Sequence, residues 1–321
     1  MSGDSAMGYN TPMPKNKKKH HYVPKFYLKG FADPGREPYL WVYEKGNTAI
    51  RKSLPENEGC ENYYHAFDTE NGRDTDTVED WLEKTESAVA PLILKLCGRE
   101  VLDDRERWVF SHFLALMIVR VPNFRSNVEE MFGELQRKIV DGILGMEGFE
   151  EIVRNHEKKT GKSLADPADL KQFVLGEYNG DVGPDLSLGL MIGDRSKIAR
   201  IFHDMTWTFI EATDEWKFVT SDNPLFFDVP THDPRLIVGG GLGSKNVEVS
   251  FPVTRDLALV ATWDRMEGLE GGYLKNKELV KNTCRRTVIN ARRFVYAPVK
   301  SDALNRLVQK HGDSSPKMRV I

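Results

Sequence analysis

Residues His20–Phe31 read HHYVPKFYLKGF, and this stretch anchors the predicted fold. The proline ring at position 24 disfavours helical backbone at the residue before it, so residues 20–23 are expected to be extended. Pro24 itself suits the first position of a helix, which is predicted to cover Lys25–Lys29 and to stop at Gly30 in a left-handed conformation. We therefore expect a strand or strand end that leads directly into a short helix.

The polar side chains of this stretch are candidates for a functional site. In an extended segment His20 and His21 point to opposite faces, so they are poor candidates for binding one metal ion together. We expect His21 to reach a pocket as a catalytic group, and His20 and Tyr27 to contact a substrate. The alternative is that both histidines form hydrogen bonds at a sheet edge.

Length and composition are those of a globular protein. The chain has 321 residues, of which 40% are hydrophobic and 29% are charged, and its net charge is -3. This charge argues against a broadly basic nucleic-acid-binding surface, although Lys15 and Lys17–Lys19 form a local basic cluster. We predict a disordered basic leader over residues 1–19, a single domain over 20–300 and a C-terminal tail over 301–321.

Several classes of protein are disfavoured by the sequence. The three cysteines, Cys60, Cys97 and Cys284, show no CxxC spacing, so neither a zinc knuckle nor a disulfide framework is predicted. The longest apolar run, Trp108–Val119, is too short to span a bilayer. The N-terminus lacks the apolar segment of a secretory signal. We expect a cytoplasmic protein without membrane association.

The middle of the chain has helical periodicity. A helix is predicted to begin at Asp76, to carry Glu79, Glu83 and Glu86 on neighbouring parts of its surface, and to kink or end at Pro91. Carboxylates in this arrangement can supply a base or metal ligands, or can simply form a solvated face.

A second helix is predicted to run from Asp103 or Asp104 to about Arg120. This helix is apolar nearly all round, which indicates a central buried helix. Arg120 in its last turn either complements the helix dipole or recognises an anionic ligand. A further helix is expected from Asp166 to about Tyr178.

Strand patterns dominate after residue 206. Apolar residues alternate over 207–209 and 216–218, which predicts a β-hairpin, and strict alternation over Val247–Val253 predicts a strand that pairs with Leu257–Trp263. A last helix near Lys277–Ala291 precedes a strand at Phe294–Ala297. The predicted fold class is α+β, with a helical middle segment packed on a mainly antiparallel sheet formed by N- and C-terminal strands.

The sequence TSDNP at Thr220–Pro224 is a second candidate site. Strand ends are where rigid scaffolds commonly present functional residues. Asp222 is expected to be a general base or a metal ligand, and Ser221 and Asn223 to bind substrate. The alternative is an Asx turn, which Asp and Asn before proline form without any ligand.

These motifs resemble those of a mainly bacterial family that is known only as domain of unknown function number 4238. The resemblance rests chiefly on HHYVP at residues 20–24 and SDNP at 221–224, and it extends from about Lys19 to Ala297. The resemblance to the family continues between these two motifs, at Val78–Glu79, Leu82, Glu86, Arg120 and Pro122. The resemblance implies that these polar positions matter to the family, and it implies no particular reaction.

Two functions follow as expectations. The first is a nuclease-like hydrolase of a phosphodiester or other anionic substrate, in which His21 is the base, Glu79 and Asp222 hold Mg²⁺ or Mn²⁺, and Arg120 binds the anion. The second is a non-catalytic binding or regulatory protein in which both motifs are structural. An enzyme requires these side chains to line one concave pocket, whereas a structural role leaves them dispersed and internally hydrogen-bonded.

Overall fold

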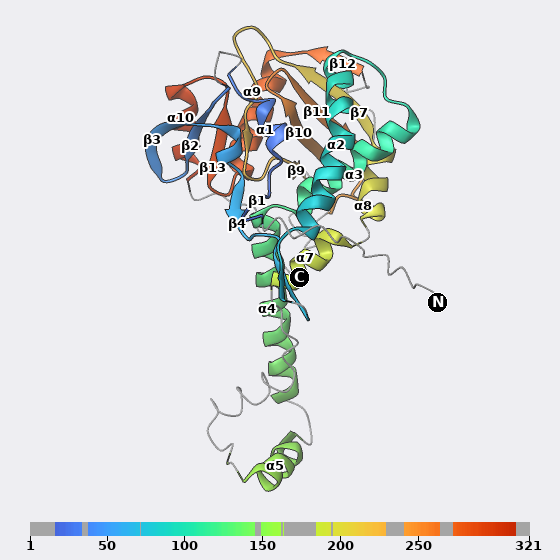
Figure 1. The fold of residues 1–321 in the computed structure, drawn as a ribbon, viewed down its shortest axis with the longest axis vertical. Coiled ribbons are helices and arrows are strands. Elements are labelled where there is room, and N and C mark those ends of the chain that lie inside the picture. Colours follow the sequence, from blue (N-terminus) through green and yellow to red (C-terminus); the bar gives the residue numbers. More distant parts are fainter. Residues whose placement is uncertain are drawn as a thin grey trace, which may run out of the picture.

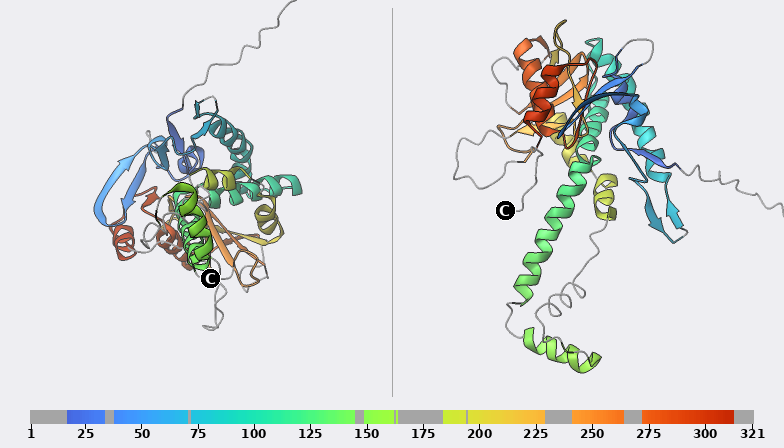
Figure 2. Two further views of the ribbon diagram at one scale, coloured as in Figure 1. Left: turned by 90° about the horizontal axis from the view of Figure 1, so that it is seen from below. Right: turned by 90° about the vertical axis from the view of Figure 1, so that its left-hand side faces the viewer.

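A computed structural model describes residues 17–33, 38–70, 72–144, 149–161, 163, 184–193, 195–228, 241–263 and 272–312. Figure 1 shows a body of sheets and helices, from which helix α4 (Pro122–Leu144) projects, with helix α5 (Phe149–Thr160) at its far end. The right-hand view of Figure 2 shows the same projection from the side. Most of the predicted leader and the helix predicted over 166–178 lie outside the described residues.

The opening stretch forms the strand and short helix that its sequence predicts. Strand β1 (Lys19–His21) pairs antiparallel with β4 (Cys60–Asn62), and helix α1 (Lys25–Lys29) follows. Gly30 ends α1 in a right-handed conformation with φ -64°, so the predicted left-handed stop is wrong. A glycine that does have a left-handed backbone next to this segment is Gly59 (φ +61°), where an added Cβ would lie 2.8 Å from Val23 Cβ. This glycine lets β4 approach the HHYVP segment closely.

Two larger sheets form the body. The four-stranded sheet is antiparallel and joins both ends of the chain, as predicted. Its order is β3 (Asn47–Ser53), β2 (Leu40–Glu44), β13 (Phe294–Ala297) and β8 (Thr220–Ser221).

The five-stranded sheet is built mainly from the second half of the chain. Its order is β12 (Gly272–Lys275), β7 (Thr206–Glu211), β11 (Leu257–Thr262), β10 (Glu248–Thr254) and β9 (Phe226–Asp228). The β10–β11 pairing confirms one predicted hairpin, whereas the hairpin predicted between 207–209 and 216–218 is wrong. Strand β7 pairs instead with β11 and, in parallel, with β12. Residues 212–219 lead from β7 to β8 in the other sheet.

The helices α2 (Thr77–Cys97) and α8 (Ser196–Asp204) both pack on α3 (Asp104–Val119). Helix α3 starts with the predicted capping box, in which the Asp103 carboxylate accepts from Glu106 N and the Glu106 carboxylate accepts from Asp103 N. Helix α2 continues through Pro91, so it does not end there, which was one of the two predicted outcomes. The remaining described elements are η1 (Pro55–Asn57), β5 (Phe67–Thr69), β6 (Gly72–Asp74), α7 (Pro184–Ile192) and α9 (Lys277–Asn290).

The core lies between α3, α1 and the five-stranded sheet, which confirms α3 as a central buried helix. The Phe113 ring contacts the Phe251 ring of β10 at 6.1 Å between centroids, and Phe110 contacts Trp207 of β7 at 5.7 Å. Tyr27 of α1 stacks on Phe251, and its hydroxyl donates to Pro252 O of β10 and contacts Thr220 Oγ1 of β8, both at 2.7 Å. Tyr27 thus links the two sheets.

The predicted C-terminal tail contains a helix that the sequence reading missed. Helix α10 (Asp302–Lys310) is capped by the Ser301 hydroxyl, which accepts from Leu304 N, and it buries Val308 completely. Gln309 of this helix donates to Glu44 O at the end of β2. Within the described residues, no helix has both the length and the apolar character needed to cross a membrane. The cytoplasmic location stays a prediction.

Candidate functional site

A cavity of about 460 Å³ lies between helix α2 and the N-terminal segment. We call it the α2 cavity. One side is formed by α2 residues at helical spacing, and the other by β1 and α1. Its lining consists of Lys17, Lys19, His21, Lys25, Phe26, Glu79, Leu82, Glu83, Glu86, Ser87 and Ala90. The cavity therefore combines an imidazole, several lysines and several carboxylates.

His21 and Lys25 are the cavity groups best placed to act on a ligand. His21 Nε2 lies 3.3 Å from Glu56 O, which fixes a tautomer in which Nδ1 carries the lone pair. Burial lowers the pKa of His21 below its usual value, and the nearby Lys25 charge acts in the same direction. The Lys25 side chain makes no ion pair or hydrogen bond with the described part of the chain. By contrast, Lys17 binds Asp80 and Glu83, and Lys19 binds Glu56 O.

Arg120 lies behind the cavity and does not line it. Only 1% of its side chain is exposed, and its Nη2 donates to His21 O at 2.6 Å and to Glu86 Oε1 at 3.1 Å. The structure thus turns the charge of Arg120 toward Glu86 and the backbone, and not toward the cavity in which an anionic substrate was expected. Arg120 instead ties His21 and α2 together, and Glu86 lines the cavity in front of it.

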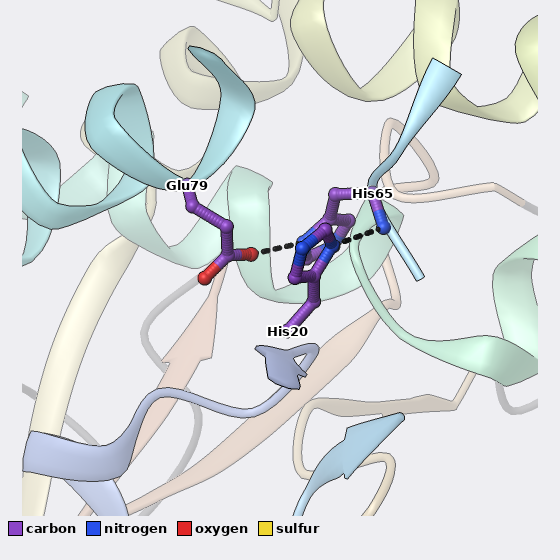
Figure 3. Close-up of side chains that lie close together, drawn as sticks. All are labelled: His20, His65 and Glu79. Carbon is purple, nitrogen blue, oxygen red and sulfur yellow. Dashed lines mark hydrogen bonds and ion pairs between the residues drawn. The ribbon is translucent and has the colours of Figure 1, made fainter. Parts of the chain in front are cut away.

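Behind Glu79 lies a group of metal-ligand-type side chains, His20, His65 and Glu79, which we call the His–Glu cluster. One possible ligand atom from each residue lies within 4.8 Å of the others. Figure 3 shows Glu79 reaching from α2 toward the His65 ring, with the His20 ring beside it. The His65 ring is stacked near that of His20 with 5.8 Å between centroids. Within the described residues, the His–Glu cluster is the place where three side chains, from among His, Cys, Asp and Glu, lie close enough together to hold a metal ion.

His65 is held in a defined state by this arrangement. Its Nδ1 lies 2.6 Å from Glu79 Oε1, and burial lowers the pKa of His65 to about 4. A neutral ring that donates its Nδ1 proton to the carboxylate leaves a lone pair on Nε2. That Nε2 atom is buried and has no hydrogen-bond partner. The protein thus leaves one polar atom of the cluster unsatisfied, which is uncommon for a buried group.

We predicted that His20 contacts a substrate. Its side chain is instead fully buried and does not reach the α2 cavity. Its Nε2 donates to Lys17 O at 2.8 Å, and its Nδ1 accepts from His65 N at 2.9 Å. Tyr27, also predicted to bind substrate, is buried between the two sheets and does not line the α2 cavity. Of the N-terminal candidates, His21 alone lines this cavity.

The SDNP segment is closed by backbone hydrogen bonds. The buried Asp222 carboxylate accepts from the three amides of Arg292, Arg293 and Phe294, at 2.7 to 2.9 Å. Asp222 and Glu79 do not share a metal-ligand group within the described residues, so the structure does not provide the expected Glu79–Asp222 metal pair. The carboxylate instead holds β8 to the start of β13.

Ser221 and Asn223 have similar local roles. The Ser221 hydroxyl accepts from Asn223 N, and the Asn223 amide donates to Asn290 O at 2.9 Å. Asn290 returns a hydrogen bond to Asn223 O at 2.7 Å. Both side chains are buried, so neither faces the α2 cavity as a substrate-binding group. The Ser221 hydroxyl makes a local turn bond, whereas Asp222 and Asn223 bond to backbone groups distant in sequence rather than forming the Asx turn given as the alternative.

His65 is the residue of the cluster that sequence reasoning missed. It lies in the turn after β4, in a stretch rich in aromatic residues for which we predicted no functional side chain. The β1–β4 register places His20 opposite Glu61, four positions before His65. No local sequence signal gives this register, because the two strands are joined through a hairpin, a 3-10 helix and α1.

The comparisons with known proteins place the chain in a family without assigning it an activity. The family model described as "Protein of unknown function (DUF4238)" matches residues 19–301, so the chain belongs to this family. This match confirms the family that the sequence resemblance indicated. No curated protein and no solved structure matches the chain.

Proposed function

We propose that the protein is a hydrolase that binds a phosphodiester or another anionic substrate in the α2 cavity. The observation that carries this proposal is the pairing, on one cavity wall, of an imidazole with a lysine that no described side chain neutralises. An ammonium group without a carboxylate partner favours an anionic ligand. A neutral imidazole beside it can accept a proton from water.

Each cavity residue has a role in this proposal. Lys25 holds the anionic group of the substrate, and His21 accepts a proton from the attacking water through Nδ1. Arg120 fixes the backbone at His21 from behind, through its 2.6 Å hydrogen bond to the carbonyl, and so positions the imidazole. Glu79 and Glu86 give the opposite wall negative charge, which restricts where an anionic group can sit.

The proposal is tested with His21→Ala and with Ser87→Ala as its control. Ser87 also lines the cavity, but its hydroxyl donates to Glu83 O within its own helix. Both variants are assayed with bis(4-nitrophenyl) phosphate and with DNA and RNA oligonucleotides. Loss of a general base is expected to lower turnover by about 100-fold or more, whereas the control keeps it. Thermal melting should be nearly unchanged in both variants.

Turnover of these substrates by His21→Ala at the wild-type rate would contradict the assigned role of His21. Absence of turnover by the wild-type protein on all of them would remove phosphodiesters as the substrate class. Equal loss in His21→Ala and Ser87→Ala would show that the cavity shape matters and the imidazole does not.

A second candidate function is non-catalytic binding of an anionic ligand in the same cavity. The observation that favours it is the burial and internal hydrogen bonding of the other motif residues, notably His20, Tyr27 and Asp222. In that case the wild-type protein binds an oligonucleotide or a phosphorylated ligand, Lys25→Ala weakens this binding, and no product forms. Calorimetric binding measured beside the turnover assay separates the two functions.

A further inference from the structure

We propose that the His–Glu cluster is a binding site for a divalent transition-metal ion, with His20, His65 and Glu79 as its protein ligands. The three side chains come from β1, from the turn after β4 and from the first turn of α2. Their possible ligand atoms already lie within 4.8 Å of one another. The inference goes beyond the proposed hydrolysis, since metal binding is measured without any substrate.

The unsatisfied nitrogen of His65 points to a missing ligand. Its side chain is 1% exposed, and its Nε2 has no hydrogen-bond partner. A buried polar atom without a partner destabilises the fold, because it has lost its hydrogen bond to water and gained none in return. An ion bound in the cluster, or a water molecule that the ion carries, supplies the partner that the protein does not. His65 Nε2 is thus a buried nitrogen with a free lone pair, which is what a metal ion requires of an imidazole ligand.

His20 has the surroundings of a metal-ligating histidine. Such histidines usually donate their second ring N–H to a carbonyl or carboxylate, which fixes the tautomer. His20 Nε2 donates to Lys17 O at 2.8 Å, so the lone pair lies on Nδ1, next to His65. At present Nδ1 accepts from His65 N, and ion binding exchanges this hydrogen bond for coordination. Lys17 in turn is held by Asp76 and Asp80 of the α2 start.

Glu79 supplies both the negative charge and the entry path. Its carboxylate contacts His65 Nδ1 at 2.6 Å, and 13% of its side chain is exposed. Of the three donors, Glu79 is the one that lines the α2 cavity. The lone pair of His65 is on Nε2, and each ligand of a zinc ion lies about 2.0–2.2 Å from the metal, so Glu79 must release His65 Nδ1 and turn toward the Nε2 side of the ring when the ion enters. The cavity provides the space from which the ion approaches.

The donor set selects the kind of metal. Imidazole nitrogen suits Zn²⁺, Fe²⁺, Co²⁺ and Ni²⁺, whereas Mg²⁺ prefers oxygen ligands in octahedral geometry. Two imidazoles and one carboxylate match the three-ligand sets of catalytic zinc sites, which keep one position for water. We therefore infer a site for Zn²⁺ or a similar ion, and this replaces the Mg²⁺ or Mn²⁺ expected from Glu79 with Asp222.

The inference is tested on the full-length protein after treatment with a chelator. Co²⁺ alone is titrated in and followed by its visible absorption, and Zn²⁺ is then added to displace it. The diagnostic variant is Glu79→Gln, which keeps an acceptor for His65 but loses the negative charge. The matched control is Glu83→Gln, one helical turn further along α2, where the side chain is 71% exposed.

We expect one Co²⁺ per wild-type chain, displaced by Zn²⁺ but not by Mg²⁺. Affinity is expected to fall about tenfold or more in Glu79→Gln and to stay unchanged in Glu83→Gln. Absence of Co²⁺ binding by the wild-type protein, or equal affinity in wild type and Glu79→Gln, would overturn the inference. The hydrolysis proposal is judged separately by the His21 variant, so the two can fail independently.

A crystallographic measurement covers the case in which Glu79→Gln does not fold. Wild-type crystals soaked in Zn²⁺ are expected to show an anomalous scattering peak bounded by His20, His65 and Glu79. A peak at another position, with none between these residues, would contradict the site.

Discussion

The SDNP segment and the α2 cavity carry similar polar residues, yet the fold uses them in opposite ways. Both carboxylate oxygens of Asp222 are occupied by backbone amides of the segment that leads into β13. Glu79 contacts one buried imidazole and remains open to a cavity. In the first region the hydrogen bonds of Asp222 hold two strands together, and we call this arrangement the closed lock. In the second region His65 Nε2 has no hydrogen-bond partner.

This contrast shows why residue type alone does not identify a site. A carboxylate that already accepts three backbone N–H bonds has little capacity left for a metal ion or a proton. A carboxylate that has a side-chain partner and an open side can still change partners. The number of hydrogen bonds already made is therefore a better guide than the identity of the residue.

The largest expected loss of stability is that of Asp222→Ala. This change leaves three amides without their acceptor, at about 1–3 kcal/mol each. The free energy of unfolding in urea should fall by about 4 kcal/mol. The control Asp228→Ala, at the exposed end of β9, should change it by less than about 0.5 kcal/mol. A stable Asp222→Ala protein would show that the lock is not structural and would return Asp222 to the list of catalytic candidates.

Arg120→Met should have the next largest effect. It removes one partner of a buried ion pair and leaves Glu86 and His21 O without their donor. We expect a loss of about 3 kcal/mol in the free energy of unfolding. Arg99→Met breaks the more exposed ion pair with Glu211, so its loss should stay below about 1 kcal/mol. Equal losses in the two variants would argue against a buried positioning role for Arg120.

Tyr27→Phe tests the link between the two sheets. The variant keeps the ring packing on Phe251 but loses the hydroxyl contacts to Thr220 and Pro252. Denaturant unfolding should show a loss of about 1–2 kcal/mol. Tyr39→Phe loses only a solvent-exposed contact with Lys52 and is expected to be nearly neutral. If Tyr27→Phe proved neutral as well, the hydroxyl would have no role in joining the sheets.

The smallest effect on stability is expected for Lys25→Ala, because Lys25 is exposed and has no partner among the described residues. Its free energy of unfolding should stay within about 0.5 kcal/mol of wild type. KM for an anionic substrate should rise about tenfold, since Lys25 binds the charged group in both ground and transition states. Lys29→Ala, on the same helix but outside the cavity lining, is the control. An unchanged KM would remove Lys25 from the substrate site.

Local signals predicted much of the fold. The capping box at Asp103 and Glu106 marked the start of α3, and strict alternation marked β10 and β11. Pro91 does not end α2, which continues to Cys97. Val89, Leu92 and Ile93 around it are buried, and this packing outweighs the hydrogen bond that proline removes. The hairpin expected before residue 218 failed because β7 finds its partners far along the chain, in β11 and β12.

The candidate site could be predicted only in part. The sequence suggested Glu79 and His21, since a helical row of carboxylates and a histidine-rich segment are visible locally. It could not supply His65, which meets Glu79 only after β1 and β4 have paired. It also could not show that Asp222 and Arg120 are occupied, because their partners are distant in sequence: backbone amides for Asp222, and His21 O with the Glu86 carboxylate for Arg120. Contacts of this kind depend on the assembled fold.

The most direct test of the contrast is one pair of isosteric variants, Asp222→Asn and Glu79→Gln, compared by denaturant unfolding. In Asp222→Asn an NH₂ group faces backbone N–H donors, so we predict a loss of about 3 kcal/mol. In Glu79→Gln the amide oxygen can still accept from His65 Nδ1, so we predict a loss below about 1 kcal/mol. Equal losses, or a larger loss for Glu79→Gln, would contradict the division into a closed lock and an open site.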